Sequence, residues 1–149
     1  MHAPSPSLTG IHAVIVDDHA DTRTLVSEVL TYAGASVIVA ASAREAASLL
    51  DGADVVVTDY AMPGETGLWL LERVRERRYP IPVIVVTGYA DLYAKELRTA
   101  PFARVLGKPI DPTILLEEMR VRAETAPRPH IDDVHKAAGL SGDDIPASK

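Results

Sequence analysis

Side chains that could do chemistry stand at the ends of four short apolar segments of this chain. In chain order they are Asp17-Asp18, Asp59, Thr87-Gly88 and Lys108-Pro109. A single acid in such a place is usually a turn or capping residue, but this series follows successive runs rich in valine and isoleucine, which are typical of buried parallel strands. Because the carboxyl ends of parallel strands meet at one edge of a sheet, we expect these carboxylates, the hydroxyl and the ammonium to gather there.

Clustered carboxylates indicate a cation site. Their mutual repulsion raises their pKa values, and a hard divalent cation relieves it. Oxygen ligands with room for water favour Mg²⁺, with Mn²⁺ as the alternative. A lysine and a threonine facing such a metal suit a phosphoryl group, whose transfer depends on charge neutralisation more than on covalent chemistry. Because a carboxylate can itself be the nucleophile, an aspartyl-phosphate is the expected product.

The elements that must position these groups alternate regularly. Apolar runs predict strands at 13–18, 35–40, 53–59, 81–88 and 103–108. Amphipathic segments predict helices at 22–33, 43–50, 67–78, 90–99 and 112–124, with Asp21, Ser42 and Asp111 as N-caps. The apolar runs barely alternate with polar residues, so we expect the strands to be covered on both faces. Five strand–helix units are too few for an eight-unit barrel, which leaves an α/β fold with a doubly wound, five-stranded parallel sheet and five helices.

Composition narrows the class of protein. The 149 residues suit one domain, and a hydrophobic share of 47% suits a globular chain. The net charge of −6 counts against direct nucleic-acid binding. The absence of cysteine excludes disulfides, thiol catalysis and zinc–thiolate sites. No apolar segment has the length of a membrane span or a signal-peptide core, so we expect a soluble, cytoplasmic protein with no membrane partner.

The two ends differ from the middle of the chain. Residues 1–10 are rich in proline and serine, and we expect a flexible N-terminus. Residues 125–149 hold prolines and paired aspartates but few large apolar side chains. They predict a mostly disordered tail, or a linker toward an output domain outside this sequence. The folded domain is therefore expected at 11–124.

The run from Val55 to Gly67, VVVTDYAMPGETG, resembles the phosphoacceptor segment of the receiver domains of bacterial two-component response regulators. Its pattern is Asp, two residues, Met-Pro, three residues and Gly. The other polar strand ends match the remaining signature positions of that family in order and spacing, and the resemblance covers residues 11–124. It implies a flavodoxin-like fold with the strand order 2-1-3-4-5.

The resemblance also implies a metal site. By that likeness Asp59 is the phosphoacceptor, and Asp18 and Asp59 bind Mg²⁺ directly. Asp17 acts largely through water, and the backbone carbonyl of Ala61 is a further ligand.

The likeness assigns a phosphoryl cradle as well. Lys108 pairs with Asp59 at rest and with the phosphoryl group afterwards, while Thr87 donates its hydroxyl to a phosphoryl oxygen. Backbone N–H groups of Ala61 and Gly88 complete the cradle, and the Lys108–Pro109 bond is expected to be cis.

The implied function is a phosphorylation-dependent signalling module rather than an enzyme. Its chemistry is limited to its own phosphorylation and autodephosphorylation, and its donor is a histidine kinase or a histidine phosphotransfer protein. The downstream protein target is unknown, and the oligomeric state is left open between a monomer and a phosphorylation-dependent dimer. Because no output domain is expected within these residues, the chain is either a stand-alone response regulator or a receiver cut from a larger hybrid kinase or regulator.

Two other functions fit the sequence less well. An aspartyl-phosphate phosphatase of the haloacid dehalogenase type needs a second acid two residues after its nucleophile, where this chain has Ala61. A flavin or nucleotide carrier needs a glycine-rich cradle after the first strand, where residues 17–22 are acidic and lack glycine. Both are therefore disfavoured.

Some positions depart from the family or have no assigned role. Val105 stands where relatives often have an aromatic switch residue, so movement on phosphorylation is expected at Tyr89 instead. His19 follows the aspartate pair and is interpreted as a residue that lines the loop. A kinase-docking surface is expected on the first helix, around Arg23, Leu25 and Val26, together with Ile110.

Overall fold

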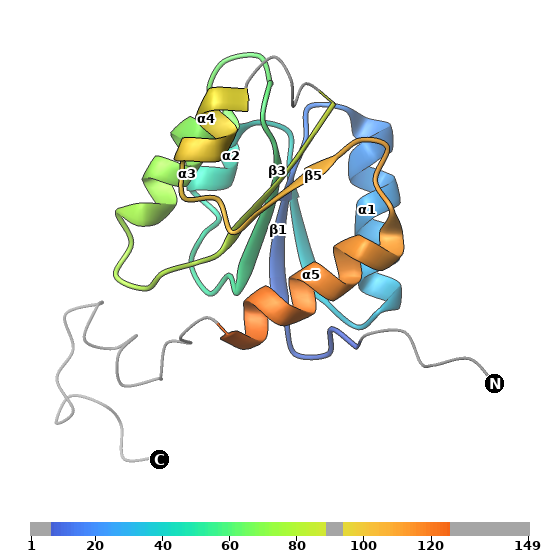
Figure 1. Ribbon diagram of the computed structural model, residues 1–149. Coiled ribbons are helices and arrows are strands. Elements are labelled where there is room, and N and C mark those ends of the chain that lie inside the picture. Colours follow the sequence, from blue (N-terminus) through green and yellow to red (C-terminus); the bar gives the residue numbers. More distant parts are fainter. Residues whose placement is uncertain (1–6, 89–93, 126–149) are drawn as a thin grey trace, which may run out of the picture.

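The computed structural model describes residues 7–88 and 94–125, and within them five parallel strands form one sheet in the order β2-β1-β3-β4-β5 (Figure 1). The strands are β1 (His12–Val16), β2 (Ser36–Ala40), β3 (Val55–Asp59), β4 (Val83–Thr87) and β5 (Arg104–Gly107). The helices are α1 (Ala20–Tyr32), α2 (Ala43–Ala47), α3 (Gly67–Arg75), α4 (Ala94–Thr99) and α5 (Pro112–Thr125). The predicted doubly wound α/β fold and its strand order are confirmed.

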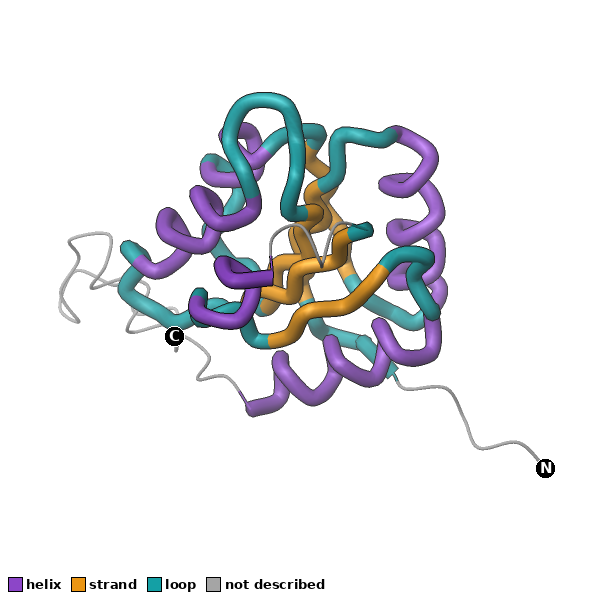
Figure 2. Tube along the Cα trace, turned by 45° about the horizontal axis from the view of Figure 1, so that its top comes forward, coloured by secondary structure: helices purple, strands orange, loops and turns teal. Residues whose placement is uncertain are grey.

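Two helical layers enclose the sheet (Figures 1 and 2). Along β1, Ala13 and Ile15 pack into the core beneath α1 and α5, whereas Val14 and Val16 pack into the core beneath α2 and α3. The central strand β3 divides its valines in the same way. Successive side chains of a strand point to opposite faces, so a strand between two helical layers must be apolar at nearly every position.

The two edge strands do not follow that expectation. On β2, Ile38 and Val39 are 50% and 43% exposed, and Arg104 of β5 is exposed as well. An edge strand has a neighbour on one side only, and the short helices α2 and α4 leave part of its surface open. The prediction that the apolar runs are covered on both faces is therefore correct for β1, β3 and β4 and wrong at the edges.

Capping side chains explain where α2 and α5 begin. The Ser42 hydroxyl accepts the backbone N–H of Glu45 at 3.1 Å, and a carboxylate oxygen of Asp111 accepts that of Thr113 at 2.9 Å. Both predicted caps are confirmed. Asp21 is not a cap, because α1 begins one residue before it and His19 holds the N-cap position without a capping side-chain hydrogen bond. The helices α2 and α3 also end three residues earlier than predicted.

The fold begins before residue 11. Leu8 is fully buried in the core beneath α1 and α5, and its backbone N–H donates to the carbonyl of Ala33 at 2.8 Å. Residues 7–10 are therefore part of the folded domain, which corrects the expectation of a flexible segment through residue 10. The remaining expectations for the ends concern residues 1–6 and 126–149, which lie outside the described residues, as does Tyr89.

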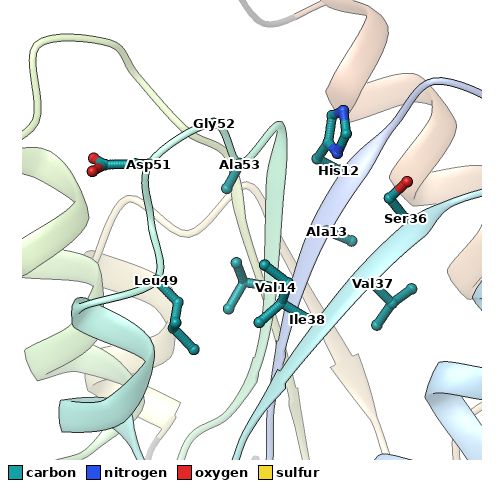
Figure 3. A pocket seen from close by; sticks show the side chains of 10 residues that line it. All are labelled: His12, Ala13, Val14, Ser36, Val37, Ile38, Leu49, Asp51, Gly52 and Ala53. Carbon is teal, nitrogen blue, oxygen red and sulfur yellow. The ribbon is translucent and has the colours of Figure 1, made fainter.

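Two further features bear on where a functional site can lie. A pocket of about 330 Å³ opens at the amino ends of β1 and β2 and is lined by their first residues and by residues 51–53 (Figure 3). It faces away from the edge where the predicted polar residues stand. Among the described residues, no helix is both long enough and apolar enough to cross a bilayer.

The burial of Leu8 can be tested directly. We expect Leu8→Ala to lower the free energy of unfolding by about 2–5 kcal/mol, because it leaves a cavity in a packed core. The exposed Leu25 provides a matched control, and Leu25→Ala should change stability by less than about 0.5 kcal/mol. Urea denaturation measures both values, and equal stabilities for the two variants would contradict the placement of Leu8.

Candidate functional site

The predicted polar residues meet at the carboxyl edge of the sheet, which Figure 2 turns toward the reader. Asp59 and Thr87 are the last residues of β3 and β4. Asp17 directly follows β1, and Lys108 directly follows β5. The parallel register aligns these ends, because it pairs Asp59 with Val86 and Thr87 with Gly107. The neighbours β1 and β3 lie where the chain reverses its winding direction, which is the usual position of a site in such sheets.

A single ammonium group bridges the two most buried carboxylates. The Nζ atom of Lys108 donates to Oδ2 of Asp17 at 3.0 Å and to Oδ2 of Asp59 at 3.2 Å. Both aspartates are only 4% exposed. The aim of Lys108 is fixed through its backbone, whose N–H donates to the carbonyl of Thr87 at 3.0 Å. The Lys108–Pro109 bond is cis, as predicted.

The turn after β3 holds the Asp59 carboxylate in place. Oδ1 of Asp59 accepts the backbone N–H of Tyr60 at 2.7 Å, and the carbonyl of Tyr60 accepts the N–H of Gly67 at 2.8 Å. A Cβ atom at position 67 would lie 2.7 Å from the carbonyl oxygen of Asp59. Glycine at the start of α3 is therefore what lets this helix approach the strand end.

The loop after β1 gathers the remaining acidic groups. Oδ1 of Asp17 accepts the backbone N–H of His19 at 2.8 Å, and the guanidinium of Arg23 donates to the Asp17 carbonyl at 2.7 Å. Oδ1 of Asp18 is buried and accepts no hydrogen bond from the described residues. Among the described residues, the hydrogen-bond donors around this loop therefore do not satisfy every carboxylate oxygen.

Burial and charge shift the pKa values in this cluster. Burial raises the pKa of Asp59, and the nearby carboxylate of Asp17 raises it further, while Lys108 acts in the opposite direction. Burial alone would lower the pKa of Lys108, but its hydrogen bond to Asp17 and the charges of both carboxylates outweigh burial and raise it. The ammonium of Lys108 therefore stays charged. Ionisation of Asp59, in contrast, lowers the free energy of unfolding.

The donor set fits a divalent cation. Asp17, Asp18, His19 and Asp59 each offer a ligand atom, and these atoms lie within 4.8 Å of one another. Opposite ligands of an octahedral Mg²⁺ stand about 4.2 Å apart. Oδ1 of Asp18, which accepts no hydrogen bond from the described residues, is the kind of buried polar atom that a metal would satisfy. Three carboxylates facing one lysine also leave negative charge for a cation to balance.

The other predicted site residues lie at the same edge of the sheet. Thr87 is buried, whereas Gly88 is exposed and Ala61 is half-buried in the loop after β3. A Cβ at position 88 would make only an ordinary 3.9 Å contact with Lys108. Val105 is half-buried and packs against the small core around Tyr60, Val85 and Leu97.

Sequence reasoning did not identify three groups that position the site. These are the Arg23 guanidinium, the backbone N–H of Tyr60 and Gly67, which lets α3 approach the Asp59 carbonyl. Arg23 acts through a carbonyl six residues away, for which the sequence carries no signal. The glycine was visible in the motif, but its contact with the Asp59 carbonyl exists only once α3 packs on the sheet.

Comparison with known proteins agrees with the family resemblance found in the sequence. A family profile described as the response regulator receiver domain matches residues 13–120. A crystal structure of a CheY-like response regulator receiver domain protein from Methanospirillum hungatei superposes with a TM-score of 0.69 and 27% identity. That similarity covers 76% of this chain and 94% of the other.

Two curated relatives cover about three quarters of the chain. An uncharacterised 14.6 kDa protein from Leptolyngbya boryana is 39% identical over 116 residues, which are 74% of this chain and 88% of that protein. The Regulator of RpoS of Escherichia coli is 35% identical over 116 residues, which are 75% of this chain. The match spans only 34% of the length of that regulator.

The raised pKa of Asp59 predicts a stabilising substitution. The charged form of Asp59 is disfavoured in the fold, so its destabilising effect is absent at low pH and develops as pH rises through the raised pKa. In metal-free buffer Asp59→Asn should therefore raise the Tm at pH 7 by a few degrees. The gain should shrink toward pH 4, near the ordinary pKa of an aspartate.

Thermal unfolding followed by circular dichroism measures this difference. The exposed Asp51 lines the pocket at the amino ends of β1 and β2, and Asp51→Asn serves as the control that should not raise the Tm. A lower Tm for Asp59→Asn at pH 7 would mean that the attraction of Lys108 outweighs burial and repulsion.

Proposed function

This chain belongs to the response regulator receiver domain family, and on that premise we propose that it accepts a phosphoryl group on Asp59. The donor in this proposal is a histidine kinase or a histidine phosphotransfer protein. The observation that carries the proposal is Asp59 itself, which ends the central strand, is 4% exposed and contacts Lys108 at 3.2 Å. A carboxylate so placed is oriented by two donors, the N–H of Tyr60 and the ammonium of Lys108, and lies at the carboxyl edge of the sheet.

The proposed transfer needs little from the protein beyond positioning and charge. A carboxylate oxygen of Asp59 attacks the phosphorus of a phosphohistidine, the P–N bond breaks, and its electron pair leaves with the imidazole. Lys108 then exchanges its contact with Asp59 for one with a phosphoryl oxygen. In the proposal Thr87 donates its hydroxyl to a second phosphoryl oxygen, and the N–H groups of Ala61 and Gly88 complete the cradle.

The proposed cofactor is Mg²⁺, with Mn²⁺ as the alternative. Asp18 and Asp59 would hold it directly, Asp17 largely through water, and the carbonyl of Ala61 would add a ligand. When bound, the ion neutralises charge on the phosphoryl oxygens as they approach the carboxylates. The Asp18 oxygen that accepts no hydrogen bond from the described residues and the cluster of four ligand atoms support this assignment.

The proposed role is that of a switch rather than of an enzyme with turnover. The chain would undergo its own phosphorylation and autodephosphorylation and pass the resulting change to another protein or to a further part of a longer protein. Val105 is half-buried among aliphatic and aromatic side chains and has no hydroxyl to present. The output would therefore not rely on an aromatic residue turning at this position.

A docking surface for the donor is proposed on α1 and α5, which lie side by side in Figure 1. Leu25 is 55% exposed and Ile114 is 47% exposed, and their helices α1 and α5 both begin at the edge of the sheet that carries the site. Val26 belongs to the buried core, Ile110 packs against it, and Arg23 is engaged by the Asp17 loop. Among the residues expected there from the sequence, Leu25 is the exposed apolar one, and we add Ile114 of α5 to it.

Phosphorylation should depend on both Asp59 and the metal. Incubation of the protein with a small phosphodonor and Mg²⁺ should give one aspartyl-phosphate, detected by intact-mass spectrometry. Asp59→Asn and excess EDTA should each remove it, whereas Asp51→Asn should retain it. A phosphoryl group on another residue of the wild type would refute the assignment of Asp59, and unchanged labelling in EDTA would refute the role of the metal.

The docking surface predicts a difference between two donors. Leu25→Ala and Ile114→Ala should slow phosphotransfer from a phosphorylated histidine kinase about tenfold, because truncation of a central apolar contact costs about 1–2 kcal/mol. Neither should slow phosphorylation by a small donor. Ile38→Ala, on the edge strand β2, provides an equally exposed control. Equal losses with both donors would indicate damage to the site instead of to docking.

A further inference from the structure

The imidazole of His19 is the one side chain of the acidic cluster that the proposed function does not use. We propose that His19 is a nitrogen ligand of the metal ion, and that it shifts the preference of the site from Mg²⁺ toward ions such as Co²⁺. This inference rests on the proposed function, because it concerns the metal site assigned there. It replaces the interpretation of His19 as a residue that only lines the loop.

The position of the ring nitrogen supports coordination. Nδ1 of His19 lies 3.2 Å from Oδ1 of Asp17 and 3.3 Å from Oδ1 of Asp18. Adjacent ligands of an octahedral ion with bonds of about 2.1 Å stand about 3.0 Å apart. The nitrogen therefore stands at a ligand's distance from two carboxylate oxygens of the cluster, with all four ligand atoms within 4.8 Å of one another.

The backbone holds His19 at this position without using its side chain. Its N–H donates to Asp17, and its carbonyl accepts the N–H of Arg23 at 3.1 Å in the first turn of α1. His19 is the N-cap residue of this helix, but its side chain makes no capping hydrogen bond. The ring is turned toward the carboxylates instead, so metal binding would not require the helix to lose a cap.

The exposure of the ring permits the tautomer that coordination needs. A neutral imidazole offers a lone pair on one nitrogen only, with the proton on the other. The His19 side chain is 69% exposed, so a proton on Nε2 can be hydrated by solvent. The contact of Nδ1 with the carboxylates can therefore be exchanged for a metal bond without burying an unsatisfied donor.

The chemical consequence is a change of metal preference. Carboxylate and carbonyl oxygens suit Mg²⁺ and Mn²⁺, whereas imidazole favours later transition ions, and affinity rises from Mn²⁺ to Co²⁺ and Ni²⁺. Mg²⁺ gains little from a nitrogen ligand. The proposed oxygen site with an added imidazole should thus discriminate for Co²⁺ over Mg²⁺ more strongly than the same site without the imidazole.

Calorimetric titration of the full chain with Co²⁺ and with Mg²⁺ tests this inference. His19→Gln should weaken Co²⁺ binding about tenfold or more and Mg²⁺ binding by less than about twofold. His12→Gln is the matched control, because His12 begins β1 at the opposite end of the strand, and it should change neither affinity. Asp18→Asn should weaken the binding of both ions and so identifies the signal that belongs to the site.

A second measurement detects the bond between the metal ion and the His19 nitrogen. With Mn²⁺ bound, pulsed electron paramagnetic resonance should detect a directly coordinated nitrogen in the wild type and in His12→Gln, and none in His19→Gln. If Asp18→Asn weakens both ions but His19→Gln leaves the Co²⁺-to-Mg²⁺ ratio and the nitrogen signal unchanged, the inference is overturned and the metal site stands. If Asp18→Asn weakens neither ion, the metal site of the proposed function is wrong, and the inference falls with it.

Discussion

One ammonium group shared between two buried carboxylates is the interaction on which the site depends. Lys108 contacts Asp17 and Asp59 from the end of a different strand, so the three side chains meet only if β1, β3 and β5 end at the same edge. Burial and mutual repulsion raise the pKa of Asp59, and the lysine offsets only part of that cost. The same excess of negative charge that disfavours the fold is what makes the site suitable for a cation.

The rest of the fold can be understood as support for this edge. Strands β1, β3 and β4 are buried on both faces. This packing fixes the position of the residues at their carboxyl ends. The approach of α3 to the Asp59 carbonyl requires glycine at position 67. The edge strand β2 contributes less to this support, and its side chains Ile38 and Val39 are exposed. The apolar pocket at the amino ends of β1 and β2 (Figure 3) is at the opposite end of these strands from the site.

The loop between β1 and α1 combines structural and chemical roles within three residues. Asp17 accepts the N–H of His19 and the ammonium of Lys108, and Asp18 keeps a buried oxygen without a hydrogen bond from the described residues. His19 starts α1 through its backbone while its ring faces both carboxylates. This division leaves the His19 ring available for a ligand, because its side chain makes no capping hydrogen bond with α1.

The amino-acid pattern was sufficient for the fold class, for the strand order through the family resemblance, and for the residues that end each strand. Apolar periodicity and capping residues such as Ser42 and Asp111 are local properties, and a chain displays them in order. The exposure of β2, the burial of Leu8 and the approach of Asp59 to His19 depended on packing between segments distant in sequence. The shared ammonium had the same origin, since Lys108 and Asp17 stand 91 residues apart in the chain. Distances of this kind arise when helices and strands close on one another, and local sequence does not encode them.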